Sequence, residues 1–258
     1  NTLYLALLRH SDLASIDFSK MKFCGAGGMA MTTSVAEEWL DVTGCEITEG
    51  YGLTECSPVV SVNIPGKIKL GTVGPAVPET ELKVVDLQGN TLGPKEKGEL
   101  WVRGPQVMLG YWEKPEATAE AITKDGWFKT GDFAEIGIDN YVSIVDRKKD
   151  MIITGGENVY SSEVEACLYQ HPDVHECAVV GVPDDAYGEA LLAVVVTTPG
   201  AVLTDTILIA HCRDRIGGYK IPRRYRFVDE LPKSAMNKIL KNELRRMVST
   251  EGCAGLEA

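Results

Sequence analysis

The spacing of apolar residues changes twice along this chain, and no other feature of the sequence constrains the fold as strongly. Helical patterns at 2–9 and 33–43 alternate with short extended pieces at 22–24 and 46–48, and glycine-rich turns separate them. Helices that alternate with strands are typical of an α/β layer. The sequence therefore predicts such a layer over residues 1–65.

From residue 66 to residue 146 the pattern changes to short runs in which apolar and polar residues alternate. Turn signals at 88–90 and 139–140 separate these runs, as expected for antiparallel strands joined by tight turns. The predicted strands are 81–85, 99–103, 133–136 and 141–145. This part is predicted to be an antiparallel β subdomain, either a small barrel or a sheet.

A third pattern begins after the charged stretch 147–150. Ser162 and Glu165 have the spacing of a capping box, which predicts a helix that stops at Pro172. The later apolar runs and predicted elements are 177–182, 191–197, 206–216, 225–228 and 237–247. Together they predict a small, mobile α+β domain over 151–248, with a hinge at 147–150 and a tail at 249–258.

Composition excludes several classes of function. The net charge of −11 argues against general binding of nucleic acid or of a membrane surface, because both usually recruit excess Lys and Arg. No apolar run is long enough for a membrane helix. The seven scattered cysteines have no C-x-x-C spacing and are predicted to be reduced. We therefore expect a cytoplasmic protein without an integral membrane segment.

One stretch runs against the acidic composition. Residues 219–246 contain nine Lys or Arg against three Asp or Glu. Such a local excess is either a solvated helix face or a patch that suits a small polyphosphate ligand.

Two glycine-containing patterns in the first layer could receive a ligand. Gly25-Ala26-Gly27-Gly28 lies between a predicted strand and helix, where a flat ring or a phosphate can approach a backbone without side chains. The stretch from Glu49 to Glu55 combines an aromatic ring between two glycines with a hydroxyl and a carboxylate, groups suited to a base, a phosphate and Mg²⁺. A tight turn and a polar loop with a buried tyrosine are the alternatives.

Three further patterns follow in order. Gly126 to Asp132 ends in a carboxylate beside the β subdomain, either a bidentate acceptor or a turn cap. Val145 to Asp150, followed by 153–158, combines a charged stretch with a glycine pair. The segment 231–238 ends in Lys238.

In this order the five patterns resemble the adenylate-forming superfamily, which contains acyl-CoA synthetases, peptide-synthetase adenylation domains and luciferases. The resemblance covers nearly the whole chain, and Tyr51 to Glu55 matches the family's tyrosine-glycine-x-threonine-glutamate signature. It implies the carboxyl-terminal part of an α/β adenylate-binding domain with an antiparallel β subdomain, followed by a small α+β domain.

The resemblance also implies roles for individual residues. It assigns nucleotide or coenzyme A binding to Gly27, Gly28, Tyr51, Gly52, Asp132, Arg147, Gly155 and Gly156. Asp132 would accept both ribose hydroxyls, and Gly155-Gly156 would line the tunnel for pantetheine. Catalysis is assigned to Lys238, Thr54 and Glu55, Mg²⁺ binding to Glu55, and the hinge to Lys149. Where the family usually has a glycine before its catalytic lysine, this chain has Asn237, a residue that tolerates left-handed backbone.

The implied reaction joins a carboxylic acid, most like a medium- to long-chain fatty acid or an aryl acid, to coenzyme A with ATP and Mg²⁺. A homodimer is left open. The family's phosphate loop has no match in the sequence, so we expect the chain to be a fragment that is inactive alone. The alternatives are an adenylation enzyme that loads a carrier protein, and a non-catalytic module that binds a nucleotide or acyl-CoA.

Overall fold

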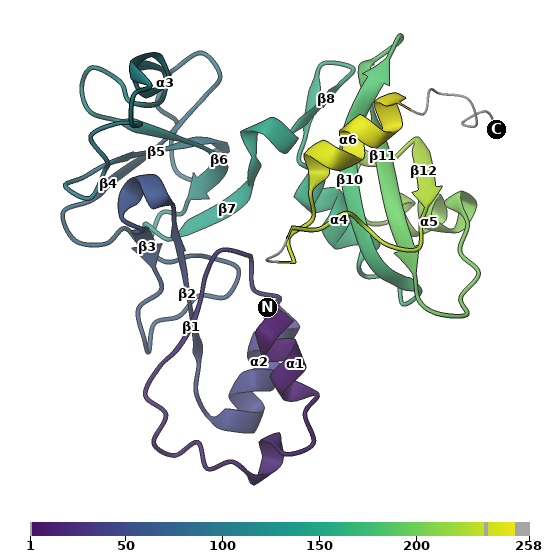
Figure 1. The fold of residues 1–258 in the computed structure, drawn as a ribbon, viewed down its shortest axis with the longest axis horizontal. Helices are drawn as coiled ribbons and strands as arrows, with labels where there is room; N and C mark the ends of the chain where they lie inside the picture. The colour runs from purple at the N-terminus through teal and green to yellow at the C-terminus, as the bar shows by residue number, and fades with distance from the viewer. Residues whose placement is uncertain (1, 235–236, 251–258) are drawn as a thin grey trace. The chain divides into compact units, whose positions relative to one another are not determined.

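The chain divides between Ile144 and Val145 into two units, residues 1–144 and residues 145–258. The computed structural model describes residues 2–234 and 237–250, so the predicted tail lies almost wholly outside the described residues. Each unit has its own sheets and its own buried core (Figure 1). The predicted hinge at 147–150 begins shortly after the division, and its motion stays a prediction.

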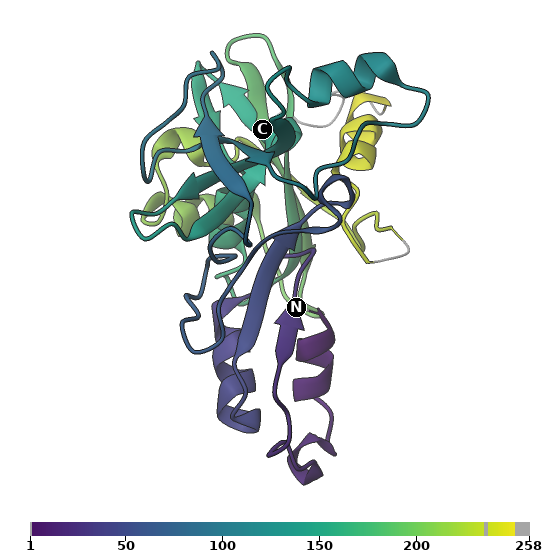
Figure 2. The same cartoon turned by 90° about the vertical axis from the view of Figure 1, so that its left-hand side faces the viewer.

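The first part of unit 1 is the predicted α/β layer. Its elements are α1 (Thr2–Leu8), a 3-10 turn η1 (Leu13–Ser15), β1 (Cys24–Ala26), α2 (Thr33–Thr43), β2 (Ile47–Gly52) and β3 (Val59–Val62). Strand β1 pairs with β2 in parallel, and β2 pairs with β3 antiparallel. Val35, Trp39 and Ile47 are buried together in its core, and α1 and α2 lie on one face of the strand pair (Figures 1 and 2).

The second part of unit 1 is a four-stranded sheet in the order β4-β5-β6-β7. The strands are β4 (Glu81–Val85), β5 (Gly98–Arg103), β6 (Phe128–Ile136) and β7 (Val142–Arg147), and the last three residues of β7 belong to unit 2. Strands β4 and β5 pair antiparallel, as do β5 and β6, which agrees with the predicted antiparallel subdomain. The helix α3 (Pro115–Ala121) between β5 and β6 was not predicted.

Unit 2 is built around a long β-hairpin. Its elements are η3 (Lys148–Asp150), β8 (Ile152–Thr154), β9 (Glu157–Val159), α4 (Ser161–Leu168), β10 (Val174–Asp184), β11 (Gly188–Thr197), α5 (Asp205–Arg213), η4 (Gly218–Lys220), β12 (Arg224–Phe227) and α6 (Lys241–Thr250). Strand β11 pairs with β10 along its length, and with β8 and β12 on its other edge.

The hairpin strands are apolar on both faces because helices cover both. Val179 and Leu191 belong to the core that includes α4 and α5, whereas Val180 and Leu192 belong to the core that includes Leu244 of α6. Successive strand residues point to opposite faces of a sheet. The continuous apolar runs of the sequence are therefore strands that helices cover on both faces of the sheet (Figure 1).

The predicted capping box of α4 is wrong. The Ser162 amide donates to the Asp146 carboxylate at 3.1 Å, and the Glu165 carboxylate accepts from the Val179 amide at 2.7 Å. The Asp146 carboxylate of β7 thus accepts a hydrogen bond from the first turn of α4. Glu165 binds the sheet instead of the backbone at the start of its own helix.

The ends of two helices also differ from the prediction. Helix α4 ends at Leu168, ahead of Pro172, and α6 begins at Lys241 instead of residue 237. In the segment before α6, the Ser234 amide donates to the Lys238 carbonyl at 2.8 Å. Within the described part of the chain, no helix has the length and apolar content needed to cross a bilayer.

Candidate functional site

The glycine cluster and the Tyr51 stretch lie next to each other because β1 and β2 are neighbours. Ala26 pairs with Glu49, and a Cβ on Gly27 would lie 3.3 Å from the Gly50 carbonyl oxygen. Gly28 has a φ of +79°, in the left-handed region that favours glycine. The Glu49 carboxylate accepts from the Met31 amide at 3.1 Å, and burial raises the pKa of Glu49. The first two sequence patterns therefore form one surface.

Tyr51 meets Asp132, although they are 81 residues apart in the sequence. The Tyr51 hydroxyl donates to the Asp132 carboxylate, with 2.5 Å between the oxygens. Asp132 is buried, with 6% of its surface exposed. Burial and the neighbouring Asp132 charge raise the pKa of Tyr51 far above its usual value, so Tyr51 stays a neutral donor.

Asp132 projects from a bulge in β6. Glu99 pairs with Phe133 and Trp101 pairs with Lys129, so the single residue Leu100 faces three residues, 130–132. The Thr130 hydroxyl donates to the Leu100 carbonyl at 2.7 Å and accepts from the Asp132 amide at 3.1 Å. Bulges redirect side chains and are over-represented beside active sites.

Gly52 is the last residue of β2, and Glu55 lies in the turn that follows the strand. A Cβ on Gly52 would lie 1.9 Å from the Pro58 carbonyl oxygen, so only glycine fits this approach of two backbones. The turn η2 (Thr54–Cys56) follows, with Thr54 exposed and the Glu55 carboxylate accepting from the Tyr111 hydroxyl at 3.0 Å. The Glu55 carbonyl also accepts from the Met108 amide at 2.8 Å.

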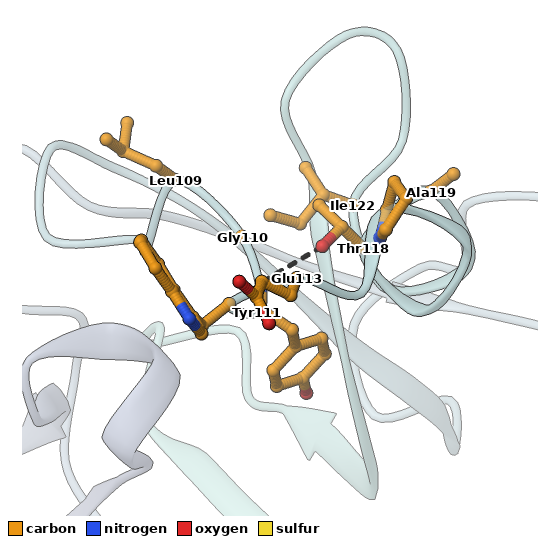
Figure 3. A pocket seen from close by; sticks show the side chains of 9 residues that line it. Leu109, Gly110, Tyr111, Glu113, Thr118, Ala119 and Ile122 are labelled. Atoms are coloured by element: carbon orange, nitrogen blue, oxygen red, sulfur yellow. Dashed lines mark hydrogen bonds between the residues drawn. The ribbon is translucent and has the colours of Figure 1, made fainter.

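The segment that carries Tyr111 lines an open pocket of about 620 Å³. The loop around Leu109 and Tyr111 faces α3, and the Tyr111 amide donates to the Thr118 hydroxyl at 2.9 Å (Figure 3). Leu109 and Trp112 are almost fully exposed. Through Tyr111, this loop is linked to Glu55.

Glu55 suits a metal ion that arrives with a phosphate ligand. Mg²⁺ is usually held by one or two carboxylates together with phosphate and water oxygens. A carboxylate offers about four lone-pair positions, and the Tyr111 hydroxyl takes one of those on Glu55. Among the described residues there is no cluster of three or more potential metal ligands. Glu55 therefore fits Mg²⁺ brought by a nucleotide better than a resident metal.

The other predicted site residues lie in unit 2. Arg147 and Lys149 are exposed, and the Lys149 carbonyl accepts from Arg245 of α6 at 3.1 Å. Gly155 and Gly156 form the turn between β8 and β9, with φ values of +58° and +85°. The Gly155 amide donates to the Tyr187 carbonyl at 2.9 Å, which ties this turn to the tip of the hairpin.

Lys238 lies on the exposed loop before α6. Asn237 has a φ of 60°, in the left-handed region that asparagine tolerates better than most residues. The Lys238 amide donates to the Ser234 hydroxyl at 3.2 Å. On the same segment, the Lys233 ammonium donates to the Glu176 carboxylate at 2.6 Å, near the start of β10 and at the other end of that strand from the hairpin tip.

The structure thus brings together Tyr51 and Asp132 directly and places Gly27, Gly28, Gly52, Thr54 and Glu55 on the elements around them.

Sequence reasoning missed three residues whose side chains bind these site residues or the start of α4. These are Glu99, whose carboxylate accepts from the Gly131 amide, Tyr111 beside Glu55, and Asp146 at the start of α4. A glutamate inside the apolar strand pattern of β5 was the one signal available for Glu99.

Two family models match the chain. The model described as AMP-binding enzyme matches residues 1–112, and the model described as AMP-binding enzyme C-terminal domain matches residues 163–238. Both of the chain's units are therefore represented.

Curated relatives and solved structures agree with these matches. A long-chain-fatty-acid CoA ligase of Salmonella typhimurium is 51% identical over 95% of this chain and 44% of its own length. A feruloyl-CoA synthase of Amycolatopsis is 43% identical over 95% of this chain and 50% of its own length. The crystal structure of ATP-bound MatB from Rhodopseudomonas palustris superposes with a TM-score of 0.88 at 35% identity, over 95% of this chain and 49% of that one. The chain spans about half the length of these relatives.

Proposed function

The chain belongs to the AMP-binding enzyme family, and from this premise we propose that it serves an acid–thiol ligase. The proposed reaction activates a carboxylic acid with ATP to an acyl-adenylate and then transfers the acyl group to coenzyme A. The products are acyl-CoA, AMP and pyrophosphate.

The contact between Tyr51 and Asp132 carries this proposal. It joins an aromatic ring to a buried carboxylate that can accept two neighbouring hydroxyls, which is what an adenosine presents as base and ribose. Gly27 and Gly28 leave the adjacent backbone open to a flat ring. Mg²⁺ would be held by Glu55 and would neutralise charge on the phosphates.

The first half-reaction brings two anions together. A carboxylate oxygen attacks the α-phosphorus of ATP, and the bond to pyrophosphate breaks. A positive charge at the attacking and leaving oxygens lowers the barrier. We assign this role to Lys238, on the exposed loop before α6.

The second half-reaction needs different groups. The thiol sulfur attacks the acyl carbon, the bond to AMP breaks, and the thiol proton is released. We assign the approach of the pantetheine chain to Gly155 and Gly156, since backbone without side chains leaves room for it. Because the segment before α6 and these glycines lie at opposite ends of the β10–β11 hairpin, we propose that the small domain, residues 151–248, rotates about Lys149. We assign nucleotide binding to Arg147, which lies on β7 ahead of this hinge.

Fatty acids are the proposed substrates, because long-chain-fatty-acid CoA ligases are 44% to 51% identical to this chain. The feruloyl-CoA synthase favours aromatic acids as the second candidate. We also propose a cytoplasmic location, supported by six free cysteines among the described residues, as expected in a reducing compartment.

The test is calorimetric titration of the chain with acyl-sulfamoyl adenosines, stable mimics of the acyl-adenylate, from acetyl to palmitoyl and with feruloyl. We expect binding that strengthens with chain length and that weakens about tenfold or more in Asp132→Ala, because charged hydrogen bonds are lost. Glu120→Ala is the control, since it removes the same charge from an exposed position on α3.

Each result decides something different. Preference for the feruloyl compound would replace fatty acids with aromatic acids. Equal weakening by Asp132→Ala and Glu120→Ala would remove Asp132 from the site. A folded chain that binds none of the compounds would contradict the adenylate site in this chain.

The proposed rotation has its own test, the substitution Lys149→Pro in the protein that performs both half-reactions. Proline at 149 disfavours the helical backbone of Lys148 within η3 and restricts the hinge. We expect adenylate formation, measured by pyrophosphate exchange, to be retained and thioester formation to fall about 10²-fold through misplacement. Equal loss of both half-reactions would contradict a hinge role.

A further inference from the structure

Glu99 is a carboxylate buried in the sheet of unit 1, where none of the sequence patterns assigned it a role. Only 7% of its surface is exposed, and it lies on β5 next to the fully buried Leu100. Burying a charge is costly unless hydrogen bonds compensate for it. Its carboxylate accepts from the Gly131 amide, with 3.2 Å between the atoms. One compensating hydrogen bond therefore comes from the bulge that carries Asp132.

Three side chains hold the bulge from three directions. Glu99 binds the Gly131 amide, and the Thr130 hydroxyl links the Leu100 carbonyl with the Asp132 amide. From β2, the Tyr51 hydroxyl binds the end of the Asp132 side chain. Leu100 alone faces three residues of β6, so these side-chain contacts replace regular ladder bonds at this point.

We propose that Glu99 is a positioning residue for nucleotide binding: it fixes the Gly131 amide and thereby the direction of the Asp132 carboxylate toward the ribose. This inference rests on the proposed function, because it needs a nucleotide at Asp132. Glu99 touches no ligand itself and acts through the bulge.

The role has a specific consequence. Without an acceptor at position 99, the half-buried Gly131 amide is left unpaired, and the bulge relaxes to satisfy it. The Tyr51 ring can still bind the base, whereas the Asp132 carboxylate is no longer oriented toward the two ribose hydroxyls. Loss of Glu99 should therefore reduce discrimination for the hydroxyls more than it reduces binding of the base.

Three variants separate positioning from folding. Glu99→Met has similar length and no acceptor, and Glu99→Gln keeps an oxygen that can accept from Gly131. Glu135→Met is the matched control, because it makes the same change farther along β6, beyond the bulge. Thermal unfolding of each variant shows whether unit 1 remains folded.

The first measurement is amide hydrogen exchange at Gly131 and Asp132 in the unliganded chain. We expect exchange about tenfold faster in Glu99→Met, as the loss of one hydrogen bond implies, and near wild type in Glu99→Gln and Glu135→Met. Unchanged exchange in a folded Glu99→Met chain would overturn the proposal without any reference to ligand.

The second measurement compares binding of AMP with binding of 2′,3′-dideoxy-AMP. We expect the wild-type preference for AMP to fall about tenfold in Glu99→Met, with binding of the dideoxy compound little changed, and to be restored in Glu99→Gln. If amide exchange in Glu99→Met were faster but the preference for AMP over 2′,3′-dideoxy-AMP were unchanged, Glu99 would not act on ribose binding. The proposed function would then still stand. A wild-type chain that binds neither compound would overturn the nucleotide site itself, and this inference with it.

Discussion

The candidate residues of the two units are held in different ways. In unit 1, the Tyr51 hydroxyl donates a hydrogen bond to the buried Asp132 carboxylate, and the close approach of the Pro58 backbone fixes Gly52. In unit 2, Lys238 and Lys149 are exposed, and Gly156 has no atom near the position of a Cβ. Groups that must recognise a ligand gain from being preorganised, whereas groups that must exchange places during a reaction need freedom.

The largest effect is expected from substitution of the exposed Lys238. Lys238→Ala should lower the rate of adenylate formation about 10²- to 10³-fold, as the loss of one preorganised charge contact does. Thioester formation from acyl-adenylate supplied to the protein should change little. Pyrophosphate exchange and single-turnover transfer measure the two steps. Arg213→Ala, which removes a charge from an exposed position on α5, is the control, and an equal fall there would contradict a specific role for Lys238.

The second prediction concerns Lys241, which fixes the start of α6 directly after the loop that carries Lys238. Directly after it, Lys241 binds the Glu165 carboxylate and the Ser161 hydroxyl, each at 2.7 Å, and so fastens α6 to α4. Lys241→Met leaves the Glu165 charge buried without this partner, so unit 2 should lose about 3 kcal/mol of unfolding free energy. Urea unfolding measures this, and Lys241→Arg is the control that keeps the charge.

The same variant has a pH signature. Burial raises the pKa of Glu165, and Lys241 counteracts that rise. A raised pKa means that the folded state binds more protons than the unfolded state, so stability falls as pH rises through this window. Without Lys241 the window extends upward, and Lys241→Met should therefore be less stable relative to wild type at about pH 8 than at about pH 5. An equal deficit at both pH values would show that the Glu165 charge is not the cause.

A third, smaller effect is expected from the difference between Gly52, which closely approaches another backbone segment, and Gly156, which has open space around it. Gly52→Ala places a Cβ 1.9 Å from the Pro58 carbonyl oxygen and should cost unit 1 about 2 kcal/mol. Gly156→Ala meets no neighbour and carries only the cost of its positive φ, about 1 kcal/mol. Hydrogen exchange under urea reports each unit separately. Equal costs would mean that the two units do not differ in this way.

Local patterns predicted the elements but not the contacts between them. The sequence predicted α2 and β4 with the bounds that the structure has, because periodicity alone identifies them. The capping box failed because Asp146 supplied a better acceptor from another element. The bulge at 130–132 depends on the register of β5 against β6, which no local pattern contains. Residue types at the site could be predicted, whereas the partners Glu99 and Tyr111 required the fold.

The smallest expected effect concerns Asn237, the residue before Lys238. Asn237 adopts a φ of 60°, a backbone that costs an ordinary residue about 1 kcal/mol and asparagine less. Glycine would remove this cost but lose more entropy on folding, so Asn237→Gly should change stability by less than about 0.5 kcal/mol. Asn237→Ala should cost about 1 kcal/mol and shift the loop that carries Lys238. Thermal unfolding and pyrophosphate exchange of both variants measure this; if Asn237→Ala were as stable and active as Asn237→Gly, the turn before Lys238 would not need the left-handed backbone.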